Sequence, residues 1–135
     1  MKEYKKSYLG LVIIILIYFI SLACLFFLKN LDPNTITHIT GILTVIFVFS
    51  ITFVIYLTGY IYWYNGISYE DALNKTKEER KIYAKKIMLI FLVFLSLYLI
   101  YSLFAIIFKF PYYGTILVLT VGLIVSAIST IKVKL

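Results

Sequence analysis

The chain has 135 residues, of which 63% are hydrophobic and 14% are charged, and its formal net charge is +7. Soluble proteins have about 45–50% apolar and about 25% charged residues, so this composition excludes an ordinary soluble domain. The apolar residues form long uninterrupted runs. This pattern predicts an all-α integral membrane protein with four transmembrane helices in a single domain covering residues 1–135.

The residue types that build disulfides and metal sites are scarce in this sequence. One cysteine, Cys24, excludes an internal disulfide framework, and one histidine, His38, is too few for a histidine metal site within one subunit. The basic residues lie at predicted helix ends, where orientation in a bilayer explains them without a nucleic acid partner. We therefore expect no metal, no cofactor and no nucleic acid.

The first predicted span is the uncharged run of residues 9–28, which follows a short basic head at residues 1–7. At about 1.5 Å per residue, this run is long enough to cross a hydrocarbon core about 30 Å thick. A cleaved signal segment is the competing interpretation, because the residues before Cys24 resemble a lipoprotein cleavage site at which that cysteine would be lipidated. The apolar run continues through Leu28, which favours a retained helix.

Residues 29–38 are predicted to form a turn, because Asp32-Pro33-Asn34 is typical helix-breaking sequence. Thr35 or Thr37 is expected to cap the helix that follows. His38 is expected to be a solvated side chain at the outer mouth of that helix.

The second predicted span covers residues 39–64, which carry no charge and are more numerous than the hydrocarbon core requires. The excess is expected to lie at headgroup depth, where amphipathic rings settle. Four such rings end the span: Tyr60, Tyr62, Trp63 and Tyr64.

Residues 65–86, here called the charged stretch, carry six basic and four acidic side chains. Ser68 and Asp71 have the spacing of a helix N-terminal capping box, and so do Thr76 and Glu79. This predicts a short helical turn after Ser68, a break near Asn74 and a new helix from residue 77. Since nothing breaks that helix before residue 109, it should run directly into the third span, residues 87–108. A tight hairpin at residues 109–114 then leads to the fourth span, residues 115–131.

The distribution of lysine and arginine predicts the topology. Three of these residues lie in the head, six in the charged stretch and two in the tail, whereas the two opposite turns hold only Lys29 and Lys109. Positive charge marks the cytoplasmic side of a membrane protein. We therefore expect a multi-pass protein of the cell (plasma) membrane with both termini and the charged stretch in the cytoplasm.

The apolar cores of the four predicted spans contain no Asp, Glu, Lys, Arg or His. Ionisable groups inside a membrane are the usual mark of proton relays, ion sites and substrate counter-ions. The sequence also lacks paired carboxylates, a nucleophile with a base, and a Gly-rich phosphate loop. We therefore expect no catalytic residues and no enzymatic activity.

Two groups of residues within the spans carry polar or small side chains. Gly122, Ser126 and Thr130 form a narrow stripe that suits close helix packing, either inside one chain or at a seam between identical copies. Tyr56, Tyr98 and Tyr101 place hydroxyls in otherwise apolar spans, where buried hydroxyls need partners. These three tyrosines predict either structural hydrogen bonds or a polar cavity for a small ligand.

The charged stretch offers a few larger side chains for contact with a partner: Tyr69, Leu73, Ile82 and Tyr83. The leading hypothesis is a small non-catalytic membrane protein that acts through protein interaction, as an accessory, immunity or regulatory subunit. Its expected partners are the lipid bilayer and a membrane or cytoplasmic protein. The alternative is an oligomeric channel or facilitator with a pathway lined by hydroxyls.

Overall fold

The computed structural model describes residues 4–25, 27–28 and 30–135. The part of the chain that the structure describes is all-helical, with 78% of its residues in helices and no strand. The elements in chain order are α1 (Leu9–Leu25), α2 (Pro33–Thr58), the 3₁₀-helix η1 (Ile61–Trp63), α3 (Tyr69–Leu73), α4 (Lys77–Ile107) and α5 (Tyr112–Ile131).

Helices α2, α4 and α5 are long and apolar enough to cross a membrane, and α1 is a shorter apolar helix of 17 residues. At 1.5 Å per residue, α4 is about 46 Å long and therefore exceeds the hydrocarbon thickness of a bilayer. The predicted all-helical class with long apolar helices is confirmed. These helices suggest a membrane protein.

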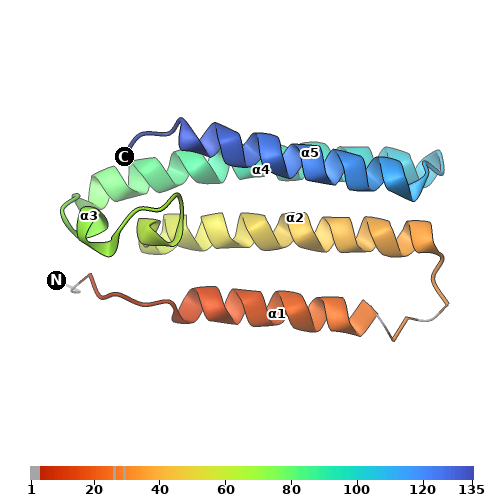
Figure 1. Cartoon of the computed structure of the whole chain (residues 1–135), viewed down its shortest axis with the longest axis horizontal. Coiled ribbons are helices and arrows are strands. Elements are labelled where there is room, and N and C mark those ends of the chain that lie inside the picture. The colour runs from red at the N-terminus through yellow and green to blue at the C-terminus, as the bar shows by residue number, and fades with distance from the viewer. Residues whose placement is uncertain (1–3, 26, 29) are drawn as a thin grey trace.

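The four long helices lie side by side (Figure 1). The described start of the chain, from Tyr4, lies with α3 and the C-terminus at one end, here called the loop end. The α1–α2 and α4–α5 connections lie at the other, here called the turn end. Helix α2 packs against α1, α4 and α5, while α4 and α5 also pack against each other. The arrangement is therefore a three-helix core of α2, α4 and α5, with α1 on the outer side of α2.

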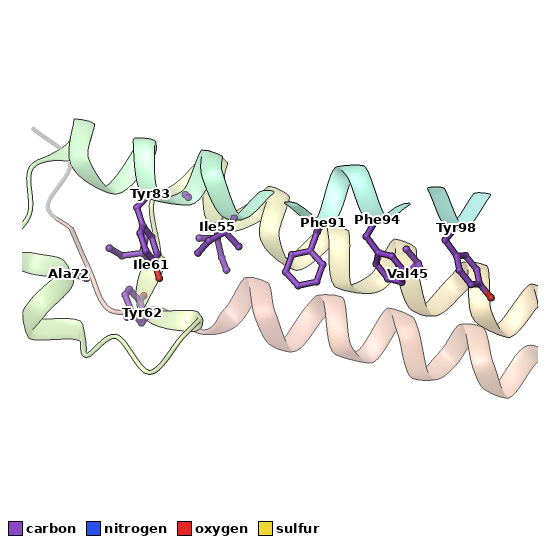
Figure 2. Close-up of a cluster of buried hydrophobic side chains, with 11 residues drawn as sticks. Val45, Ile55, Ile61, Tyr62, Ala72, Tyr83, Phe91, Phe94 and Tyr98 are labelled. Carbon is purple, nitrogen blue, oxygen red and sulfur yellow. The ribbon is translucent and has the colours of Figure 1, made fainter. Parts of the chain in front are cut away.

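The core lies between α2 and α4. Figure 2 shows Phe91, Phe94 and Tyr98 pointing from α4 toward α2, where Val45 and Ile55 are also buried. Helix α1 contributes no buried residue among those described. It is therefore held in the fold mainly by its contact with α2.

Helix α2 begins at Pro33, six residues before the predicted start of the second span. The predicted caps, Thr35 and Thr37, are wrong, because the carboxylate of Asp32 accepts hydrogen bonds from the backbone N–H groups of Asn34 and Thr35. Proline suits the first helical position, since its missing N–H group would have no partner there. The Asp-Pro-Asn sequence therefore starts the helix.

Helix α2 ends at Thr58, so the prediction of a continuous helix to Tyr64 is also wrong. Gly59 adopts a left-handed conformation with φ 75°, which suits a residue without a side chain and terminates the helix. The aromatic residues that follow form η1 and fold back at the loop end. The first helix is likewise shorter than predicted: it ends at Leu25, and Phe27 and Leu28 are not helical.

The helices predicted within the charged stretch are confirmed. Ser68 caps α3, and Thr76 and Glu79 form a complete capping box at the start of α4, which continues to Ile107. Asn65 and Gly66 both have positive φ, and Ile67 N donates to Tyr64 O, so these residues form a tight turn before α3.

Candidate functional site

Tyr4 is the centre of an aromatic cluster at the loop end. Its ring stacks on Tyr69 with centroids 5.7 Å apart and meets Tyr60 and Tyr62 edge-on at 5.8 and 6.0 Å. Its hydroxyl donates to the carbonyl of Gly59 at 2.9 Å, and its own carbonyl accepts from the Tyr69 hydroxyl. Tyr4 therefore joins the start of the chain, the end of α2 and α3.

Ser7 adds a second attachment of the same segment. Its backbone N–H donates to the Tyr62 hydroxyl at 2.8 Å, and its carbonyl accepts from Tyr62 Oη and Trp63 Nε1, both at 2.9 Å. Residues 4–8, here called the N-terminal strap, are thus fixed across the loop end. Burial raises the pKa of Tyr4 to about 12, although the nearby Arg80 charge opposes this shift.

Arg80 completes the cluster from the first turns of α4. Its guanidinium lies 3.8 Å from the centroid of the Tyr4 ring, and its Nη1 donates to the carbonyls of Ala72 and Lys75, each at 3.0 Å. Its Nε is buried without a hydrogen-bond partner among the described residues. One side chain thus holds the α3–α4 turn and the N-terminal strap together.

The four residues predicted for partner docking divide into two pairs. Tyr69 stacks on Tyr4, and Tyr83 is buried and accepts a hydrogen bond from Asn65 Nδ2 at 3.2 Å. Leu73 and Ile82, by contrast, are 51% and 57% exposed. The tyrosines therefore support the surface of the loop end, and the two aliphatic side chains face outward from it.

The predicted small-residue stripe lies within the packing of this chain. A Cβ atom on Gly122 would lie 2.1 Å from Cε2 of Phe94, so the aromatic ring occupies the space beside the glycine. Ser126 and Thr130 are buried. The carbonyl of Thr130 accepts from Asn65 Nδ2 at 3.0 Å, which ties the end of α5 to the charged stretch.

The predicted tyrosine trio does not come together. Tyr56 lies at the loop end, with Lys81 Nζ 5.6 Å from its ring centroid. Tyr98 and Tyr101 are neighbours, with ring centroids 6.2 Å apart. The Tyr101 hydroxyl pairs with Thr115 Oγ1 at 3.4 Å. The Tyr98 hydroxyl is buried without a partner among the described residues, as is Ser102 Oγ.

His38 belongs to this polar group, so its prediction as a solvated side chain is wrong. It is 3% exposed, and its Nδ1 lies 3.5 Å from Thr115 Oγ1. The early start of α2 explains the difference, because it places His38 within the helix and against α5. The buried His38 and Thr115, with the half-buried Tyr101, form a polar chain near the turn end.

Fold and site define a small helical protein whose long apolar helices suggest a membrane location, with an aromatic cluster at one end and a polar chain toward the other. Comparison with known proteins gives no match: no family model fits the sequence, no curated protein matches it, and no solved structure matches it. Function must therefore be inferred from the site.

Proposed function

We propose that this chain is a non-catalytic, four-span protein of the plasma membrane that works by binding a protein partner at its loop end, as an accessory, immunity or regulatory subunit. The observation that carries the proposal is the exposure of Leu73 and Ile82 above a firmly held loop end. Apolar side chains fixed on a rigid support contribute to binding without a large ordering cost.

The charges around Leu73 and Ile82 indicate what partner fits. Three lysines and two glutamates are exposed on the first turns of α4: Lys77, Lys81, Lys85, Glu78 and Glu79. A partner with complementary potential would present an apolar contact flanked by side chains of both signs. We therefore propose a membrane or cytoplasmic protein with a rim of mixed charge around an apolar patch.

The topology of the proposal rests on the positive-inside count of eleven basic residues against two. The fold supports it, because the described start of the chain, α3 and the C-terminus lie at the same end (Figure 1). Two counted residues, Lys2 and Lys29, lie outside the described part of the chain. The loop end is accordingly proposed to face the cytoplasm.

The oligomeric channel has less support. Its proposed seam, the stripe beginning at Gly122, faces Phe94 of the same chain. Tyr98 and Tyr101 both belong to α4, which packs against α2 and α5 of the same chain. We therefore propose the interaction role in preference to the channel.

Replacing Leu73 and Ile82 together by serine should abolish partner binding without affecting membrane insertion. Each substitution removes apolar contact area worth about 25 cal/mol per Å² buried, while the caps of α3 and α4 stay in place. A photo-crosslinking residue at Lys81, in living cells, should form one major protein adduct that the double variant reduces at least about tenfold, as a loss of about 1.4 kcal/mol requires. Leu28→Ser, at an exposed position of the turn end, is the matched control. An adduct of undiminished intensity in the double variant would refute loop-end docking.

A further inference from the structure

A cavity of about 370 Å³ opens at the turn end, between the start of α2 and the end of α4. This volume is in the range of small-ligand pockets, about 300–1,000 Å³. Its walls combine charged, polar and apolar side chains, including Asp32, Asn34, His38, Ile106, Lys109 and Phe110.

The cavity holds two opposite charges that do not neutralise each other. Asp32 and Lys109 both line it, yet the two form no ion pair in the part of the chain that the structure describes. Hydrogen bonds from the Thr35 hydroxyl and from backbone N–H groups lower the pKa of the Asp32 carboxyl, which therefore stays ionised at neutral pH. An anion and a cation on the walls of one cavity suit a ligand that carries both charges itself.

The carboxylate of Asp32 retains capacity for one more hydrogen bond. Its Oδ1 accepts from the N–H groups of Asn34 and Thr35, and its Oδ2 accepts from Thr35 Oγ1. An ionised carboxylate has about four lone-pair sites, so one site on Oδ2 is open. A primary ammonium can donate to it, whereas a quaternary ammonium has no N–H group to donate.

The opposite wall is held in place by the end of α4. Lys109 has φ 54°, and the N–H of Phe110 donates to the carbonyl of Ala105 at 2.9 Å, which closes the helix in a Schellman motif. The N–H of Tyr112 donates to Asn34 Oδ1 at 3.0 Å and joins the two turns. The charged groups are therefore carried on two connected turns.

His38 supplies a third polar group, from inside the bundle. It lines the cavity and is 3% exposed, and its only hydrogen bond among the described residues joins Nδ1 to Thr115. Nε2 is therefore the ring atom that can hydrogen-bond to a ligand in the cavity. Beside it, Ile106 and Phe110 are 56% and 40% exposed and offer apolar contact.

We propose that this cavity binds a small zwitterion with a primary ammonium a few bonds from an anionic group. The ammonium donates to Asp32, and the anionic group lies against Lys109 and His38. Two sources share this chemistry: the headgroup of phosphatidylethanolamine, whose chains would continue over Ile106 and Phe110, and a free zwitterion of similar size. The lipid source depends on the membrane location proposed above, but neither source depends on a protein partner.

The test compares lipid adducts of the purified full-length protein by native mass spectrometry. Phosphatidylethanolamine should be retained at least about tenfold better than phosphatidylcholine or phosphatidylglycerol with the same acyl chains. Asp32→Asn and Lys109→Asn should each remove that preference. Asparagine caps helices as well as aspartate does, and it tolerates the left-handed conformation of residue 109, so both variants should fold. Asp71→Asn, which removes the same charge at the loop end, should keep the preference.

Phosphoethanolamine, the headgroup without chains, separates the two sources. If it displaces the lipid at comparable concentration, the ligand is a free zwitterion and the site assignment stands. If it does not, while the lipid preference is observed, the ligand is the lipid. Equal retention of all three lipids by the unaltered protein, together with no phosphoethanolamine binding, would overturn the proposal, as would an undiminished preference in both Asp32→Asn and Lys109→Asn.

Discussion

Replacing Arg80 by methionine should release the N-terminal strap from the loop end while the long helices remain packed. The change removes two hydrogen bonds from a charged donor, to Ala72 and Lys75, and the guanidinium contact with the Tyr4 ring. Hydrogen bonds to charged groups contribute about 1.5–3 kcal/mol and cation–π contacts about 0.5–2. Since Arg80 is only partly buried, we expect the local opening free energy to fall by about 2–4 kcal/mol.

Amide hydrogen exchange measures this opening directly. Peptides covering the N-terminal strap and α3 should exchange at least about tenfold faster in Arg80→Met, and peptides in the middle of α2 should not change. The exchange rates of Arg80→Lys should be closer to those of Arg80→Met than to those of the unaltered protein, because lysine lacks the planar guanidinium that reaches two carbonyls. Lys77→Met, a charge loss at an exposed position one turn earlier, is the control. Unchanged protection of the strap in Arg80→Met would show that the aromatic contacts suffice without the guanidinium.

Gly122→Ile should destabilise the three-helix core itself. Even the Cβ atom would approach Cε2 of Phe94 to 2.1 Å, a distance that requires the ring or the helix to move. Overpacking of this kind costs about 1–3 kcal/mol and sometimes more. The free energy of unfolding in detergent should fall by at least that amount, whereas Ala127→Ile, which adds bulk at an exposed position of the same helix, should have little effect.

Combining Gly122→Ile with Phe94→Leu identifies the contact responsible. If the clash is with Phe94, the double variant should be more stable than the sum of the two single effects predicts, with a coupling of about 0.5–3 kcal/mol. A folded Gly122→Ile protein of unchanged stability but smaller detergent-solubilised size would instead place Gly122 at a seam between copies, and would contradict the intramolecular packing described here.

Local signals predicted the charged stretch well. The caps at Ser68 and Thr76 act on N–H groups three residues away, so their spacing in the sequence contains the necessary information. The start of α2 depends on equally local residues, but their pattern is ambiguous. Asp32 is a good N-cap and Pro33 suits the next position, so Asp-Pro-Asn fits a helix start as well as a helix break.

The sites at the two ends depend on contacts that no local pattern reveals. Tyr4 bonds Gly59 across 55 positions, and His38 meets Thr115 across 77. In the sequence Arg80 is one charge among ten in the charged stretch, whereas in the fold its guanidinium joins the α3–α4 turn to the Tyr4 ring. Of the four predicted docking residues, only Leu73 and Ile82 are exposed. Tyr69 bonds to Tyr4 at the start of the chain, and Tyr83 belongs to the buried core.

The central claim is that the chain crosses the membrane with its loop end in the cytoplasm and its turn end outside. Cysteine labelling with a membrane-impermeant maleimide in intact cells tests it, in a Cys24→Ser background because that cysteine is exposed. Cysteines at Asn34 and Tyr113 should label from outside, and one at Lys77 should label only after permeabilisation. If the Lys77 cysteine is labelled in intact cells and the cysteines at Asn34 and Tyr113 are not, the result would contradict the topology and the cytoplasmic docking that rests on it.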